Sequence, residues 1–277
     1  MSELRPRIPA DTKRALRQRC GFGCAMCGCP IFDYEHIYGY DTTGHDVDKM
    51  TLLCPKHHRE KTAGRLSIQR VLQSNARPFN TNRAVGATHQ LDADALNFEI
   101  ALGSLVLRSG VLDGQRTGLM VDGAHVIGAT IERGHLNLSL DIRDAQNRPI
   151  LRVTNGELRT STTIWDVTFE GNRLEVRGGK RKILIALLID PQKRLTVESA
   201  SFHNQFVKLL IGHQAPNGGV YLPNDETGLS NASLDGFYKV GRIGNYPEDE
   251  IFGSFEPRRE YGSPPVERSS GFYRPRS

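Results

Sequence analysis

The chain of 277 residues has only five cysteines, one tryptophan and no long hydrophobic run. Its longest apolar stretch, ILIALLI at 183–189, is too short to cross a membrane as a helix, so we expect no membrane contact and interpret the stretch as a buried strand. The N-terminus (MSELRPRIPADTKR) lacks the apolar segment of a secretory signal. Sparse, clustered cysteines without an export signal favour metal binding over disulfides. These absences predict a cytoplasmic protein.

The basic charge is concentrated near the N-terminus. Residues 1–90 hold 14 of the 36 Lys and Arg residues but only 8 of the 31 Asp and Glu residues, a net charge of +6 in a chain whose total is +5. Such a segment suits phosphate binding, because each cation that contacts a phosphate releases counterions. A solvated basic helix has the same composition, so the charge alone leaves both interpretations open.

Two hydrophobic patterns divide the chain. Helical patterns cover PADTKRALRQRCGF, CPKHHREKT and LSIQRVLQ before residue 77, and Pro55 suits the first position of the second helix. From about residue 91 the period changes to two, as in LNLSLDIRD at 136–144, and turn signals recur between 144 and 193. The patterns predict an α+β protein with a small N-terminal domain and a mostly antiparallel all-β domain, either a sandwich or a short β-solenoid.

The same patterns suggest domain boundaries. We expect a small N-terminal domain, a linker without periodicity, a β-rich domain of unknown role and a Gly/Pro-rich extension whose end, from about residue 256, is a disordered tail. In order, these segments are 1–76, 77–90, 91–215 and 216–277.

Four of the five cysteines lie between residues 24 and 54. Cys24-x2-Cys27 and Cys54-x2-His57 offer four soft or borderline ligands in two short motifs, a set that suits tetrahedral Zn²⁺ better than Mg²⁺ or Ca²⁺. We predict a structural zinc site that joins the first motif to the start of the second helix. The alternative is a group of free buried cysteines. Cys29 is left over, and Cys20 is either a small apolar residue or an alternative ligand.

The region around this cluster resembles the HNH endonuclease family, whose fold is the ββα-metal finger. The matching stretch runs from about Arg17 to Gly64 through RQRCGFGCAMCG, YEHI and LLCPKHHREKTAG, roughly a fifth of the chain. The resemblance implies that His36 is the general base. It also implies that Glu35 and His58 hold a catalytic divalent cation such as Mg²⁺. His57 stands where many relatives have a zinc cysteine.

By this resemblance the N-terminal domain is a zinc-stapled ββα-metal nuclease. It would hydrolyse phosphodiester bonds in DNA rather than RNA and leave 5′-phosphate and 3′-hydroxyl ends. A divalent cation stabilises the charge that develops at the phosphate, while a histidine titrates near neutral pH and suits proton transfer. The basic residues expected to contact nucleic acid are Arg17, Arg19, Lys49, Lys56, Arg59 and Lys61.

One residue departs from the family pattern. The family's middle asparagine, which braces the loop that holds the base, falls here on Lys49, and a lysine side chain has no acceptor atom. Either Lys49 contacts a phosphate while Asp46 or Asp48 braces the loop, or the site is degenerate. Two alternatives to the enzyme therefore stay open. One is a catalytically inactive zinc finger that binds nucleic acid. The other is an effector gated by a protein or small ligand that the β-domain senses. The oligomeric state has no signature in the sequence.

Overall fold

The computed structural model describes residues 6–91, 93, 98–108, 114–121, 124–133, 135–204, 207–223, 227–229, 233–235 and 242–243. The chain forms two compact units. The first consists of Met1–His89 with Arg159–Glu170, and the second of Gln90–Leu158 with Gly171–Ser277. The tail expected to be disordered from about residue 256 lies outside the described residues.

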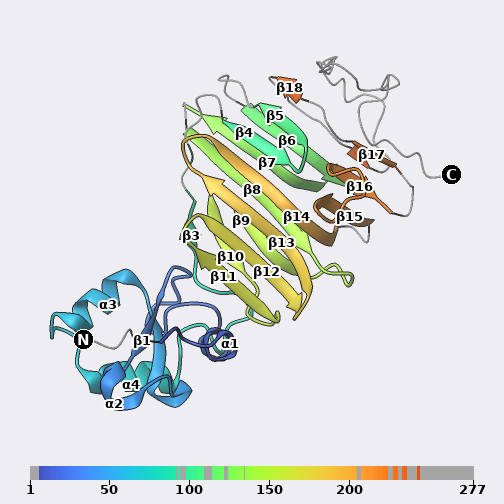
Figure 1. Ribbon diagram of the computed structural model, residues 1–277. Helices are drawn as coiled ribbons and strands as arrows, with labels where there is room; N and C mark the ends of the chain where they lie inside the picture. Colours follow the sequence, from blue (N-terminus) through green and yellow to red (C-terminus); the bar gives the residue numbers. More distant parts are fainter. Residues whose placement is uncertain are drawn as a thin grey trace. The chain divides into compact units, whose positions relative to one another are not determined.

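Among the described residues, the helices lie in the first unit, together with one short hairpin (Figure 1). Its elements are α1 (Ala10–Arg19), β1 (Asp33–His36), α2 (Tyr40–Thr43), the 3-10 helix η1 (Val47–Lys49), β2 (Met50–Leu53), α3 (Pro55–Thr62), α4 (Ile68–Ala76) and β11 (Asp166–Glu170). The three predicted helices correspond to α1, α3 and α4. Two of the three unit boundaries fall within β3 (His89–Gln90) and β10 (Glu157–Thr160), and the third follows Glu170 at the end of β11.

Local sequence signals fix where two of these helices begin. Pro55 occupies the first turn of α3, where its missing N–H has no intrahelical partner to lose, and Cys54 precedes it with extended backbone angles. The α4 helix begins after Ser67, whose Oγ accepts a hydrogen bond from the backbone N–H of Arg70 at 3.3 Å. Pro55 and Ser67 therefore mark where α3 and α4 begin.

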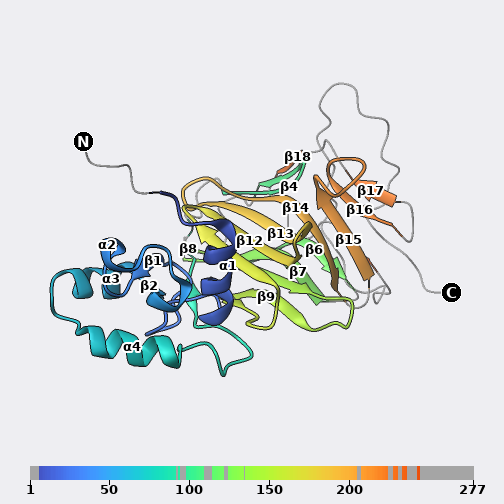
Figure 2. The ribbon, with the colours of Figure 1, turned by 60° about the horizontal axis from the view of Figure 1, so that its bottom comes forward.

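Strands β1 and β2 form an antiparallel pair that runs from Asp33↔Leu53 to His36↔Met50. Met50 and Leu52 on β2 pack with Leu16 and Cys20 of α1 in a small buried cluster. In Figure 2 helix α3 lies beside this hairpin. Because successive side chains of a strand point to opposite faces, Glu35 and His36 on β1 face different sides of the hairpin.

The second unit is a large, mostly antiparallel sheet (Figure 1). Its strands are β4 (Glu99–Leu102), β5 (Leu105–Arg108), β6 (Gly114–Val121), β7 (Ala124–Glu132), β8 (His135–Arg143), β9 (Pro149–Thr154), β12 (Arg173–Gly179), β13 (Lys182–Asp190), β14 (Arg194–Asn204), β15 (Val207–Gly212), β16 (Val220–Leu222), β17 (Thr227–Leu229), β18 (Ser233–Asp235) and β19 (Arg242–Ile243). The sheet-rich α+β class predicted from the sequence is confirmed.

Neighbouring strands of the second unit pair mainly as hairpins. Strands β6 to β9 pair antiparallel in chain order, and so do β12 to β17. Strand β4 instead lies parallel to β14, as β18 does to β5 and β19 to β6. Antiparallel pairing of successive strands differs from the parallel stacking of a β-solenoid. Burial alternates along β8, which confirms the period-two interpretation of residues 136–144.

The first unit includes two segments that the sequence did not connect with it. In the segment 77–90, predicted as a linker, the buried Asn80 side chain donates to the carbonyls of Gly21 and Gly28 at 3.0 and 3.2 Å. In the segment 159–170, Asp166 accepts two hydrogen bonds from the Arg17 guanidinium, at 2.8 and 2.6 Å. The Arg17 and Asp166 side chains are only 8% and 6% exposed. The first unit therefore depends on a buried ion pair between α1 and β11.

We expect Asp166→Ala to lower the free energy of unfolding by about 3 kcal/mol, because the substitution leaves the Arg17 guanidinium buried without its carboxylate. Urea denaturation followed by circular dichroism measures the change. As a control, Asp11→Ala removes the partner of Arg14 at a site where Asp11 is 89% exposed, and we expect no measurable change. Equal stability of the Asp166→Ala variant and the wild type would show that the pair contributes nothing.

Candidate metal centre

The four predicted zinc ligands lie together at the start of α3. The ligand atoms of Cys24, Cys27, Cys54 and His57 are all within 4.8 Å of one another. The Sγ atoms of Cys27 and Cys54 are 3.7 Å apart, and His57 Nδ1 lies 3.4 Å from Cys24 Sγ and 3.2 Å from Cys54 Sγ. Tetrahedral zinc with Zn–S bonds of about 2.3 Å separates its sulfur ligands by about 3.8 Å. The cluster is compatible with a structural zinc site.

The backbone of the first motif folds tightly around the two thiols. The N–H of Gly28 donates to the Cys24 carbonyl at 2.7 Å, and the N–H of Cys24 donates to the Cys29 carbonyl at 2.9 Å. Gly28 has a φ of +76°, and a Cβ there would lie 2.7 Å from Phe79 Cδ1. Glycine is therefore required at this position both by the backbone angle and by the close contact.

The thiols of this cluster influence one another's ionisation. The hydrogen bond between Cys27 and Cys24 lowers the pKa of Cys24 to about 4 and raises that of Cys27. Crowded thiols share protons in this way when no cation is bound, and a bound metal requires thiolates. Cys29 lies outside the group of four, and burial raises the pKa of its thiol.

The structure also brings together two of the three predicted catalytic residues. Glu35 Oε2 lies 2.9 Å from His58 Nε2, so a side chain from β1 and one from α3 meet. Glu35 is 8% exposed. Its second oxygen, Oε1, forms an ion pair with Lys61, one turn further along α3, and the same Lys61 Nζ donates to the His36 carbonyl at 3.1 Å. Two basic side chains thus surround one buried carboxylate.

Glu35 Oε2 and His58 Nε2 lie at hydrogen-bond distance, and adjacent ligands of a divalent cation have the same spacing. Adjacent ligands of an octahedral Mg²⁺, each about 2.1 Å from the ion, are about 3.0 Å apart, and the separation of Glu35 Oε2 and His58 Nε2 is 2.9 Å. Asp33 Oδ2 lies 3.3 Å from the other ring nitrogen of His58. A carboxylate on the second nitrogen is the usual partner of a metal-binding histidine, because it fixes the orientation of the ring. Sequence reasoning missed Asp33.

The third predicted catalytic residue, His36, has different neighbours. His36 Nε2 lies 3.1 Å from His45 Nδ1, and His45 Nε2 lies 2.9 Å from the Pro6 carbonyl oxygen. The Tyr40 ring packs against both histidine rings, with centroid distances of 5.5 and 4.9 Å. Sequence reasoning also missed His45, because a histidine in the loop after α2 has no ligand spacing to mark it.

The predicted nucleic-acid contacts fall into two groups. Arg17 is buried against Asp166, and the Arg19 guanidinium donates to the carbonyls of Val47 and Met50, so both arginines are engaged inside the first unit. Lys61 is paired with Glu35. The other residues predicted to contact nucleic acid are exposed, and they are Lys49, Lys56 and Arg59.

The loop before β2 is braced without an asparagine. Asp46 Oδ1 accepts a hydrogen bond from the backbone N–H of Asp48 at 2.9 Å, and Arg19 Nη1 donates to the Val47 carbonyl at 3.0 Å. The backbone N–H of Ile37 donates to the Lys49 carbonyl at 2.9 Å. Lys49 therefore contributes its backbone to the loop, while the side chains of Asp46 and Arg19 hold it.

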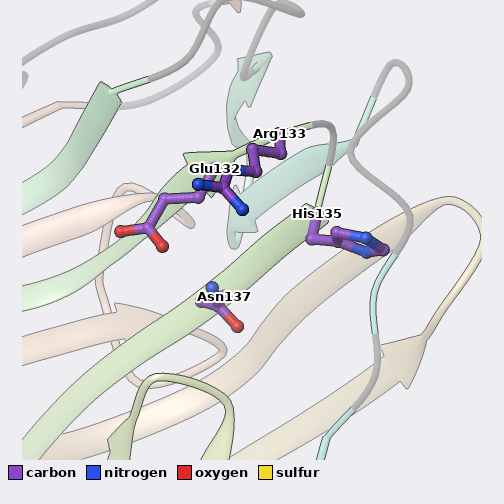
Figure 3. Close-up of a pocket in the computed structure, with 4 residues that line it drawn as sticks. All are labelled: Glu132, Arg133, His135 and Asn137. Carbon is purple, nitrogen blue, oxygen red and sulfur yellow. The ribbon is translucent and has the colours of Figure 1, made fainter.

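A separate hollow lies on the second unit at the β7–β8 hairpin (Figure 3). Glu132, Arg133, His135 and Asn137 line it, and its volume is about 490 Å³. Figure 3 shows His135 directed away from the Glu132 carboxylate. Glu132, Arg133 and His135 are exposed, so the hollow offers no buried polar group to a ligand.

Comparison of the chain with known protein families, with curated proteins and with solved structures finds no match. Among the described residues, none of the helices has the length and apolar character needed to span a membrane.

Zinc removal tests the cluster. We expect the purified protein to bind one Zn²⁺ per chain and the Cys54→Ser variant to bind none. The free energy of unfolding of this variant should be lower than that of the wild type by about 4 kcal/mol or more, because metal binding supplies folding free energy. Elemental analysis and thermal unfolding measure the two effects. Cys29→Ser, a cysteine in the same loop but outside the cluster, is the matched control and should retain the metal. Equal zinc content in both variants would contradict the assignment.

Proposed function

We propose that the first unit is a metal-dependent endonuclease of the HNH type that hydrolyses phosphodiester bonds in DNA. The observation that carries the proposal is the 2.9 Å approach of Glu35 on β1 to His58 on α3, directly beside the Cys3His cluster at the start of the same helix. A structural zinc site does not need this second pair of donors. A buried carboxylate paired with a histidine at ligand spacing suits a second, exchangeable cation.

Glu35 and His58 would hold the catalytic divalent cation, Mg²⁺ or a similar ion. When bound, such an ion neutralises charge on the phosphate and stabilises the leaving oxygen. The two side chains would supply two ligands, and the remaining positions would take phosphate oxygens and water. Asp33 keeps the His58 ring oriented, and Lys61 keeps the Glu35 carboxylate in place while bonding to the β1 backbone.

His36 would accept a proton from the attacking water. Glu35 directly precedes His36, so the proposed ligand and the base are neighbours on one short strand. The strand backbone fixes their separation, because both residues pair with β2. Such rigid placement of reacting groups is a main source of catalytic power.

The basic side chains of α3 would contact the substrate. Lys56 and Arg59 are exposed on the helix that also supplies His58, and Lys49 is exposed on the loop before β2. The net charge of +6 in residues 1–90 would attract the phosphate backbone over a longer range. We propose DNA rather than RNA as the substrate, and the cleavage experiment includes both.

One observation favours a second candidate function. The Lys61 ammonium group already pairs with the Glu35 carboxylate. A metal ion bound to Glu35 would therefore lie close to a second positive charge. If the lysine excludes the metal, the unit is a zinc finger that binds nucleic acid without cutting it. In a further alternative, the nuclease is inactive until the β-domain binds a protein or small ligand. DNA cleavage that starts only when this partner is added would identify that case.

The cleavage test uses supercoiled plasmid, single-stranded DNA and RNA with Mg²⁺ or Mn²⁺. We expect His36→Ala to lower the rate of DNA cleavage by about 10²- to 10⁴-fold while the zinc content is retained, because the substitution removes the general base. Glu35→Gln and His58→Ala should lower the rate and raise the metal concentration needed. Equal cutting by wild type and His36→Ala would rule out His36 as the base.

The control for this test is His135→Ala, which changes an exposed histidine of the second unit and should leave the rate unchanged. If neither the wild type nor any variant cuts DNA, but the protein binds DNA in a salt-dependent way, the inactive zinc finger is favoured. Neither cutting nor binding would remove nucleic acid as the partner.

Salt dependence of binding tests the α3 contacts. We expect Lys56→Gln to weaken DNA binding and to reduce the slope of log K against log salt by about 0.9, because one phosphate contact is lost. Fluorescence anisotropy over a range of NaCl concentrations measures the slope. Lys180→Gln removes the same charge from the exposed β12–β13 turn and is the matched control. Identical slopes for the two variants would show that Lys56 does not touch the phosphates.

A further inference from the structure

We propose that His45 is a positioning residue that fixes the tautomer of His36, with the ring proton of neutral His36 on Nε2. The inference rests on the proposed function for its catalytic meaning, although the tautomer itself can be measured without any cleavage. It deepens that function by naming the residue that sets the tautomer of the proposed base.

The chain of hydrogen bonds can run in only one direction when the rings are neutral. The Pro6 carbonyl oxygen has no proton, so His45 Nε2, 2.9 Å away, must be the donor. A neutral imidazole carries one N–H, and His45 Nδ1 is therefore an acceptor. His36 Nε2, 3.1 Å from it, must then carry the proton of the His36 ring. Nδ1 of neutral His36 then carries no proton.

Packing holds the rings in this arrangement. The Tyr40 ring meets the His36 ring edge to face at 82°, with 5.5 Å between centroids, and the His36 and His45 centroids are 5.3 Å apart. His36 is 8% exposed, so its ring has little freedom to turn. Gly44, at φ +55°, reverses the chain directly before His45.

The contact between His45 and His36 resembles the way in which other catalytic histidines are held. A group that holds the second nitrogen of a catalytic histidine selects the tautomer and the ring orientation, and it acts without touching the substrate. Here a second histidine takes that place, and its own tautomer is set by a backbone carbonyl at the N-terminal side of α1. The segment before α1 thereby helps to set the state of a residue on β1.

The first experiment is ¹H–¹⁵N correlation spectroscopy of the ring nitrogens in the full-length zinc-loaded protein, with His36 assigned by comparison with His36→Ala. We expect neutral His36 to be protonated at Nε2 and unprotonated at Nδ1, and His45 to show the same tautomer. In His45→Leu, which cannot accept a hydrogen bond, the single His36 tautomer should give way to a mixture or to a rapidly exchanging N–H. A His36 ring protonated at Nδ1 in the wild type would overturn the proposal.

The second measurement separates positioning from folding. We expect His45→Leu to lower kcat of plasmid cleavage by about tenfold with little change in KM, a part of the general-base contribution, and His45→Gln, whose side-chain oxygen accepts the same hydrogen bond, to restore most of it. Zinc content and the thermal midpoint are followed for each variant, and His135→Leu is the matched control. Equal losses in the Leu and Gln variants would contradict the proposal.

The spectra and the cleavage rates test separate claims. If no variant cuts DNA, the proposed nuclease function fails, but the spectra still decide whether His45 fixes the His36 tautomer. If the wild type cuts DNA and the His36 spectrum and kcat are unchanged in His45→Leu, the positioning role fails while the nuclease function stands.

Discussion

The candidate site depends on the register between β1 and β2. Leu53, the last residue of β2, lies opposite Asp33, the first residue of β1, and Cys54 follows at once as the residue that precedes α3. The helix therefore starts beside the beginning of β1. One turn into α3, His58 reaches the carboxylates of Asp33 and Glu35. A shift of one residue in this pairing would turn Glu35 away from the helix, because strand side chains alternate between faces.

The same short strand separates two chemical environments. On one face Glu35 meets the basic side chains of α3, and on the other His36 meets His45 and Tyr40. The Cys3His cluster at the start of α3 links this helix to the loop after α1. Ala25 in that loop donates its N–H to the Leu52 carbonyl at 2.8 Å, which connects the loop to β2 as well. The Cys3His cluster, the helix position and the strand pairing thus support one another.

Support for this region also comes from distant parts of the chain. The buried pair of Arg17 and Asp166 joins α1 to β11, and the Arg17 guanidinium also contacts the Tyr34 hydroxyl on β1. Asn80 bonds to two carbonyls of the loop that carries the first cysteines. A charged pair this deeply buried is costly to break, so it couples the segment 159–170 to the integrity of the first unit. The small region around the Cys3His cluster is therefore not held by that cluster alone.

Short-range chemistry in the sequence determined much of this protein. Cysteine and histidine spacing predicted the Cys3His cluster, Pro55 predicted the start of α3, and alternation predicted strands such as β8, because each signal involves residues within a few positions of one another. Only the tertiary structure decided the rest. Asp166, Asp33 and His45 have no spacing that marks them, since their partners come from other elements. Composition likewise could not show that Arg17 is buried while Lys56 is exposed, because burial of a charge depends on which carboxylate the fold brings to it.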